Sequence, residues 1–259
     1  MGATGAGAAP TWLQPQTVSG PVVQTPHVAV DAAGDAVAVW TKVEGSTYTV
    51  MAASRPAGGV WGAPVPIGTP GPEQYKCETC SDPQVGMDAT GRAYAVWSWY
   101  DSSAGQLQRK IVLRIRSASG VWGRFSTILS TIPNASEQRL AVNAAGDLAV
   151  VWRVVDNARG ITQGYFRPAP GGFVPVQTIS NTTTDAYEPE VAIDGAGNAV
   201  ATFVQGPGTP ATDYIATSFR PAAGPWGAAA PLSALGGYEH HVAVNASGDA
   251  VATWSRVDG

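Results

Sequence analysis

This sequence has little charge. Asp, Glu, Lys and Arg make up 13% of its 259 residues, about half the usual share. Lysine occurs only as Lys42, Lys76 and Lys110, and the net charge is −4. The lack of a basic run argues against nucleic acid as the main partner. No stretch reaches the roughly 18 consecutive apolar residues of a membrane-spanning helix, so we predict no membrane span.

Helical periodicity is also missing, because no ten-residue segment spaces its apolar residues as a helix does. The chain instead has 31 Gly and 20 Pro, spread along a sequence that is 44% hydrophobic. That hydrophobic share argues against disorder. Together these features favour many short strands joined by turns.

Cysteine is scarce, with only Cys77 and Cys80 in the segment KCETCSDP. The second pair that a structural zinc site needs is missing, and the motif leads into an expected strand rather than the helix of a redox CxxC. We predict a short-loop disulfide between the two, formed in an oxidising compartment. We therefore expect a secreted or cell-envelope protein, although Met1 is followed by GATGAG and no signal peptide is recognisable.

The chain repeats itself. Five similar segments occur along the sequence: HVAVDAAGDAVAVW from His27, QVGMDATGRAYAVW from Gln84, RLAVNAAGDLAVVW from Arg139, EVAIDGAGNAVATF from Glu190 and HVAVNASGDAVATW from His241. Their first residues are 57, 55, 51 and 51 positions apart. A second element, rich in Pro and Gly, follows each of the first four, as in SRPAGGVWGAPVPIG from Ser54. Internal repeats of this length are typical of propellers and other repeat folds.

Each repeated segment predicts one tight β-hairpin, from Asp31–Gly34 in the first repeat to Asn245–Gly248 in the last. The Asx side chain can accept a backbone N–H two residues on, and Gly can adopt a positive φ. The flanking strands are apolar on both faces, so they need cover on both sides. With the second element as another hairpin, each repeat has the four strands of a propeller blade.

We therefore predict an all-β fold, a five-bladed β-propeller with four antiparallel strands per blade, in a single domain of residues 1–259. Four blades are complete, and they span about residues 26–69, 83–131, 138–180 and 189–234. The closing blade is shared between the termini: residues 239–257 supply its first two strands and residues 1–19 its last two. Such sharing hides two open sheet edges. The alternative is that the chain is a fragment of a longer array.

Two repeat families resemble these segments. The pattern VAVD-x-x-G-x-x-x-V resembles the core of NHL-type propeller repeats. The outer turn SRPAGGVWGAPVPIG resembles a degenerate Asp-box of the BNR-like sialidase type, and YAVWSW at residues 94–99 is similar to a sialidase blade. The resemblance covers nearly the whole chain and implies a propeller with secreted carbohydrate biology. The catalytic Arg, Tyr–Glu and Asp set of sialidases has no matching positions here, so no activity is carried over.

The loops differ from repeat to repeat on one expected face, opposite the uniform turns. Variable polar loops on a rigid scaffold are common binding sites. Aromatic rings beside carboxylates suit sugar recognition, so we take as candidate ligand-binding residues the loop aromatics Tyr75, Trp99, Tyr100, Tyr187 and Tyr238. The alternative is that these rings only pack loops onto the blades.

A second candidate set occupies one equivalent position in every repeat, expected at the mouth of a central channel. Its members are His27, Gln84, Arg139, Glu190 and His241. The two His and Glu190 could form a metal site. Alternatively, Arg139 and Glu190 form an ion pair beside hydrated histidines, and on that reading we predict no metal and no cofactor.

Acidic residues recur two positions before this set in four repeats, as Asp82, Glu137, Glu188 and Glu239. A glycosidase needs two such acids at a defined separation, but their recurrence is more typical of a structural tie. We therefore predict a monomeric, non-catalytic propeller that binds carbohydrate or a cell-surface glycan through its variable-loop face. The alternatives are a glycoside hydrolase that uses these acids, and a protein-interaction or structural module of a larger secreted protein.

Overall fold

The computed structural model describes residues 14–45, 47–68, 82–101, 108–124, 126–130, 132–172 and 174–257. All of its regular structure is β-strand, arranged as five antiparallel sheets. No helix long and apolar enough to cross a membrane occurs in these residues. The all-β prediction is confirmed.

The first two sheets each have four strands in sequence order. The first contains β1 (Val23–Val30), β2 (Ala36–Glu44), β3 (Thr47–Arg55) and β4 (Val65–Gly68). The second contains β5 (Gln84–Met87), β6 (Ala93–Asp101), β7 (Gln108–Arg116) and β8 (Thr127–Ile128).

The third and fourth sheets repeat this arrangement, and the fifth has two strands. The third contains β9 (Ala135–Val142), β10 (Leu148–Asp156), β11 (Arg159–Arg167) and β12 (Gln177–Thr178). The fourth contains β13 (Asp185–Ile193), β14 (Ala199–Gly206), β15 (Tyr214–Arg220) and β16 (Ala230–Pro231). The fifth contains β17 (Gly237–Val244) and β18 (Ala250–Arg256).

The predicted turn forms at the tip of every first hairpin. In the first sheet, the Asp31 carboxylate accepts the N–H groups of Ala33 and Asp35 at 3.0 Å each, and Gly34 has a φ of 91°. The equivalent glycines of the other four sheets also have positive φ, and they are Gly91, Gly146, Gly197 and Gly248. The repeated sequence motif therefore produces a repeated backbone conformation.

Neighbouring sheets bury one another's apolar faces, and a separate core fills each of the three seams between the first four sheets. Val37 and Ala52 of the first sheet pack with Met87 and Trp97 of the second. Further seams join the second sheet to the third and the third to the fourth. Along the inner strands, β1 packs against β5, β5 against β9, β9 against β13 and β13 against β17. This is the side-by-side packing of propeller blades.

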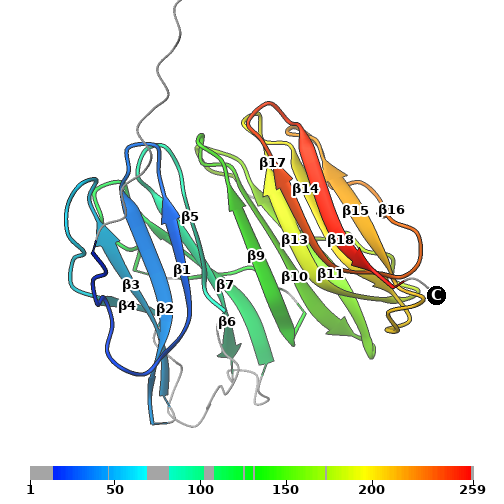
Figure 1. Cartoon of the computed structure of the whole chain (residues 1–259), viewed down its shortest axis with the longest axis horizontal. Coiled ribbons are helices and arrows are strands. Elements are labelled where there is room, and N and C mark those ends of the chain that lie inside the picture. The colour runs from blue at the N-terminus through cyan, green and yellow to red at the C-terminus, as the bar shows by residue number, and fades with distance from the viewer. Residues whose placement is uncertain are drawn as a thin grey trace, which may run out of the picture.

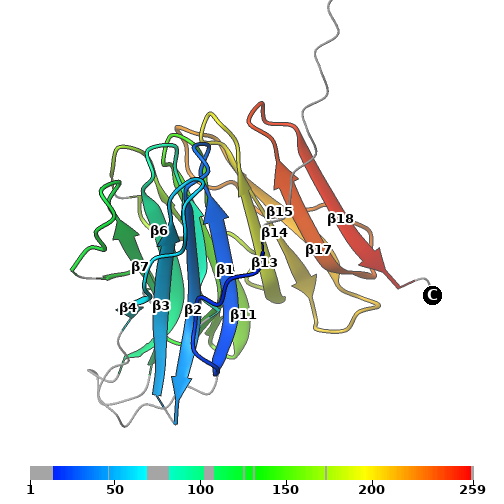
Figure 2. The ribbon, with the colours of Figure 1, turned by 60° about the vertical axis from the view of Figure 1, so that its left-hand side comes forward.

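The two end sheets lack a neighbour on one side. Figures 1 and 2 show the first sheet (blue) and the last sheet (red) apart, and no comparable packing joins β17 or β18 to β1 in the described residues. Val28 and Val30 are each 61% exposed, Val251 is 65% exposed and Trp254 is 39% exposed. Residues 14–19 form no strand, and the predicted strand in residues 1–13 lies outside the described residues.

Connections of two kinds lie at opposite ends of the sheets (Figure 1). The tight turns within both hairpins lie at one end. The connections between the second and third strands of a sheet, such as β2 and β3, lie at the other end, because the strands are antiparallel. The connections between successive sheets lie at that end too. The variable loops therefore share one face, as the sequence predicts.

The seam between the second and third sheets can be tested at Trp152, which is fully buried and donates from Nε1 to Gln163 Oε1 at 3.1 Å. We predict that Trp152→Ala lowers the free energy of unfolding by about 3–5 kcal/mol, because it leaves a cavity and an unpaired amide. Urea denaturation measures this loss. The control Val121→Ala, at a position 67% exposed, should change it by less than about 0.5 kcal/mol. A loss of less than about 1 kcal/mol for Trp152→Ala would contradict this packing.

Candidate functional site

The five predicted polar positions have the same register in their sheets. His27, Gln84, Arg139, Glu190 and His241 each lie on the first strand of a sheet and pair with the second, opposite Val39, Val96, Val151, Thr202 and Thr253 respectively. Four of them lie inside strands, because β1, β9, β13 and β17 begin four or five residues before the repeated segments of the sequence. The five residues therefore occupy equivalent positions on the innermost strands of the five sheets.

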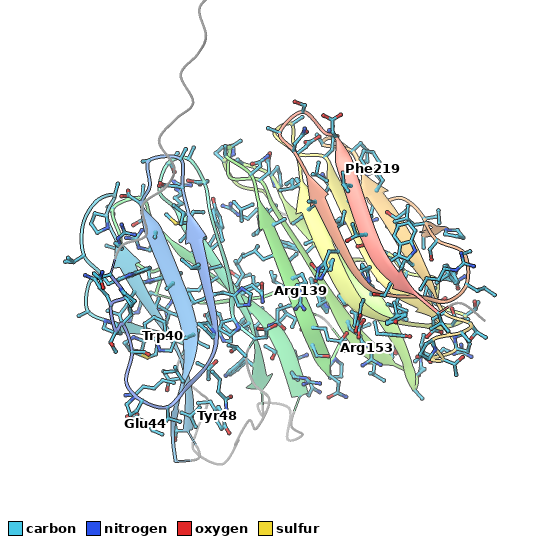
Figure 3. The ribbon with its side chains drawn as sticks, viewed as in Figure 1. Trp40, Glu44, Tyr48, Arg139, Arg153 and Phe219 are labelled. Carbon is cyan, nitrogen blue, oxygen red and sulfur yellow. The ribbon has the colours of Figure 1, made fainter. Side chains whose placement is uncertain are left out.

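Arg139 links three sheets. Its Nε donates to Glu190 Oε1 at 3.1 Å, and its Nη1 lies 3.3 Å from Asp82 Oδ2. Figure 3 shows Arg139 on β9, between the sheets at the left and right. The Arg139–Glu190 pair that the sequence suggested is therefore present, and Asp82 is a second carboxylate on the same guanidinium.

His27 extends these contacts to the first sheet. Its Nε2 lies 2.9 Å from Gln84 Nε2 and 3.5 Å from Asp82 Oδ1. If Nε2 is protonated and donates to Asp82, the Gln84 amide must present its oxygen instead. The hydrogen bond with His27, aided by the charge of Arg139, lowers the pKa of Asp82 against the opposing effect of burial. We call His27, Asp82, Gln84, Arg139 and Glu190 the inner-strand network.

His241 stands outside this network. His241 is exposed, and no contact joins it to His27 in the described residues. No group of three or more His, Cys, Asp or Glu in the described part of the chain is placed to hold a metal ion. The metal site suggested by His27, Glu190 and His241 is therefore not assembled. The buried histidine of β17 is His240, and burial lowers the pKa of its imidazole.

Three of the four recurring acids occupy an unusual backbone conformation. Glu137, Glu188 and Glu239 have φ values of 56°, 52° and 47°, and Thr25 of the first sheet has 48°. Each stands at a register shift in the pairing of its inner strand. Residues other than Gly rarely adopt positive φ, and such strain persists where the surrounding structure enforces it. Sequence reasoning found these acids but not the bulges, because Glu has no preference for this conformation.

Glu188 lies between two other acids. The Glu188 N–H donates to Glu137 Oε2 at 2.8 Å, and Glu137 Oε1 lies 3.6 Å from Arg153 Nη1. Partial burial raises the pKa of Glu188, and the negative charges of Glu137 and Glu239 raise it further. Glu188 is therefore easier to protonate than an ordinary glutamate.

The predicted aromatics do not form one platform. Tyr187 donates its hydroxyl to Asp213, whose carboxylate also accepts the Gly208 N–H at 3.0 Å, so the ring ties a loop to the fourth sheet. Burial and this hydrogen bond raise the pKa of Tyr187. Tyr238 is half-buried on β17, and Trp99 lies on β6, far along the chain from both. The contact between Tyr187 and Asp213 could not be predicted from the sequence, because only the folded loop brings the two side chains together.

Four other predicted positions are not tested. Tyr75, Cys77 and Cys80 lie outside the described residues, and so does the predicted disulfide. Tyr100 lies on β6, but its side chain is not among those described.

The charge on Glu188 gives a prediction about stability and pH. The pKa of Glu188 is raised in the folded state above its usual 4.5. Just above that pH the folded protein therefore binds more protons than the unfolded chain. The stability of the fold accordingly falls as the pH rises through the pKa of the folded state. Glu188→Gln removes the repulsion. We expect it to raise the midpoint of thermal unfolding at pH 7 and to have little effect at pH 3.5.

Glu190→Gln is the matched control, because it weakens the contact with Arg139 and should not raise the midpoint. Scanning calorimetry at the two pH values measures both variants. A gain for Glu188→Gln that is equally large at pH 3.5, or a loss at pH 7, would contradict the electrostatic account.

No protein-family model matches this sequence, and no curated protein matches it significantly. Solved structures do share its fold. A protein of unknown function from Dyadobacter fermentans DSM 18053 has a TM-score of 0.50 at 12% identity, over 85% of this chain and 71% of that one.

Two sialidases have the same fold. The intramolecular trans-sialidase of a leech has a TM-score of 0.52 at 8% identity, over 86% of this chain and 53% of that one. The NanB sialidase of Streptococcus pneumoniae has a TM-score of 0.50 at 10% identity, over 90% of this chain and 56% of that one. This chain thus spans just over half the length of these two sialidases. The similarity supports a propeller fold that resembles the fold of sialidases.

Proposed function

We propose that this protein binds carbohydrate, such as a cell-surface glycan, at the inner-strand network, and that it is a binding propeller rather than a hydrolase. The observation that carries the proposal is the continuous set of contacts from His27 through Asp82 and Arg139 to Glu190, which spans four sheets. Residues far apart in the sequence thereby present donors and acceptors in one place.

The chemistry of the network suits sugar hydroxyls. Carboxylates accept hydrogen bonds from hydroxyl pairs, and guanidinium and amide groups donate to hydroxyl and ring oxygens. The side chains of His27, Asp82, Arg139 and Glu190 remain 40%, 41%, 33% and 25% exposed. A ligand can therefore reach them, while their mutual contacts hold them in place before binding, which lowers the entropic cost of association.

Binding is favoured over hydrolysis because the acids of the network are already engaged. Asp82 and Glu190 share the guanidinium of Arg139, and the lowered pKa of Asp82 keeps its carboxyl ionised. An ionised, paired carboxylate is a good hydrogen-bond acceptor but cannot donate the proton that a glycosidic leaving group needs.

Glycoside hydrolysis is the second candidate function, and Glu188 is the observation that favours it. Its raised pKa is the property of a general acid, and its strained backbone is typical of functional sites. The leech and pneumococcal proteins of the same fold are named as sialidases. A third possibility, a protein-interaction or structural module, predicts that no sugar binds.

We also propose that the chain closes into a five-bladed ring, a monomer that acts outside the cell or in its envelope. The repeat supports closure. Val251 in the fifth sheet is equivalent to Val37 in the first, and Val30 in the first sheet is equivalent to Met87 in the second. Val37 and Met87 pack in one core. Closure would bury Val251 against Val30 in the same way.

A glycan array tests the proposed binding. We expect saturable binding of at least one glycan by the wild-type protein and at least tenfold weaker binding by Arg139→Gln, because the amide cannot hold both carboxylates. Arg55→Gln is the control, since Arg55 lies in the outer hairpin of the first sheet. Binding to no glycan would contradict the proposal.

The same bound glycan should be recovered intact after incubation, as judged by mass spectrometry. Cleavage that is lost in Glu188→Gln would instead support the hydrolase.

A cross-link tests closure of the ring. In a background with Cys77→Ser and Cys80→Ser, we expect Val30→Cys and Val251→Cys to form an intramolecular disulfide under mild oxidation, because closure brings the two positions into contact. The pair Val60→Cys and Val251→Cys is the control and should stay reduced, since Val60 lies on the outer turn. Non-reducing electrophoresis and mass analysis distinguish the products. A failure to cross-link, or a cross-linked dimer, would contradict closure within one chain.

A further inference from the structure

We propose a second binding site, for a pyranose that carries a carboxylate, in a pocket between the first and second sheets. The pocket has a volume of about 280 Å³ and is lined by Ile67, Gly68, Trp97, Trp99, Val112, Arg114, Arg124, Ser126 and Ile128. None of these residues belongs to the inner-strand network, so the proposal does not rest on carbohydrate binding there.

Two tryptophans provide the apolar wall of the pocket. Trp97 and Trp99 are two residues apart on β6, and therefore lie on the same face of the strand. Trp97 is 4% exposed and Trp99 is half-buried, and both belong to the core between the first two sheets. Trp97 is thus fixed by packing, whereas Trp99 keeps part of its indole open to a ligand.

Gly68 keeps the space beside these rings open. A Cβ atom at this position would lie 3.0 Å from Cζ2 of Trp97 and 3.1 Å from Cβ of Val50. Its backbone φ is not in the positive range, so the glycine is not needed for a turn. The absence of a side chain instead lets β4 approach Trp97 closely.

The polar side of the pocket is cationic. Arg114 and Arg124 both line it, and the lining contains no carboxylate. The Nε of Arg114 donates to the Gly123 carbonyl at 2.6 Å, and its Nη1 donates to the carbonyl of Ile67 on the neighbouring sheet. These two bonds hold the guanidinium across the seam, and Nη2 takes part in neither. In this proposal Nη2 is the atom that pairs with an anion.

An indole beside the fixed guanidinium of Arg114 favours one class of ligand. The C–H face of a pyranose packs on an indole, whose face is electron-rich, while a carboxylate pairs with guanidinium through charge-assisted hydrogen bonds. The Ser126 hydroxyl adds a donor and acceptor for a sugar hydroxyl. At this volume, near the lower end of known ligand pockets, the site takes one ring. A hexuronic acid residue has all of these features.

Isothermal titration calorimetry with D-galacturonic acid tests the site, with D-galactose as the neutral counterpart at the same ionic strength. We expect the uronic acid to bind at least tenfold more tightly than galactose. Trp99→Ala should weaken uronic acid binding at least tenfold, because it removes the stacking surface. Gly68→Ala should do the same, because its methyl group forces Trp97 or β4 to move.

Gly20→Ala is the matched control, since a Cβ there has no atom within 4 Å, and it should leave binding unchanged. Thermal unfolding of each variant shows whether it is folded. The part of uronic acid binding that depends on Trp99 should persist in Arg139→Gln, which separates this pocket from the inner-strand network. The proposal is overturned if galacturonic acid does not bind, if folded Trp99→Ala binds it as well as wild type, if Arg139→Gln abolishes binding, or if benzoate binds while the uronic acid does not.

Discussion

Burial of both faces of the second and third sheets is the constraint on which the rest of this structure depends. A sheet such as the third has buried residues on both faces, with Trp152 packed toward the second sheet and Val151 toward the fourth. It therefore needs two neighbours, and the repeats supply them in order along the chain. The same packing brings the inner strands together, so that Arg139 meets Asp82 and Glu190 from the sheets on either side.

The rigid sheets also account for the strained positions. Glu137, Glu188 and Glu239 hold positive φ values at equivalent bulges, although glutamate gains nothing locally from that conformation. The paired strands on both sides of each bulge enforce it. Strain of this kind lies beside the carboxyl of Glu188, whose pKa is raised by burial and by the neighbouring acids.

Much of the fold could be predicted because its determinants are local and repeated. The Asp31–Gly34 turn follows from Asx and Gly chemistry alone, and the Arg139–Glu190 pair follows from one shared register. Features that need two distant segments could not be predicted in this way. The tie between Tyr187 and Asp213 depends on a folded loop, and the pocket beside Trp97 depends on how closely Gly68 approaches from the next sheet.

The most direct measurement of the account is an NMR titration of the arginine Nε–Hε signals with an oligosaccharide that binds the protein. The account places Arg139 at the centre of the binding network, so its Nε–Hε signal should shift saturably, with the same dissociation constant as the binding itself. Arg55, in the outer hairpin, should show no shift. An unchanged Arg139 signal at saturating ligand would contradict the claim that the inner-strand network binds carbohydrate.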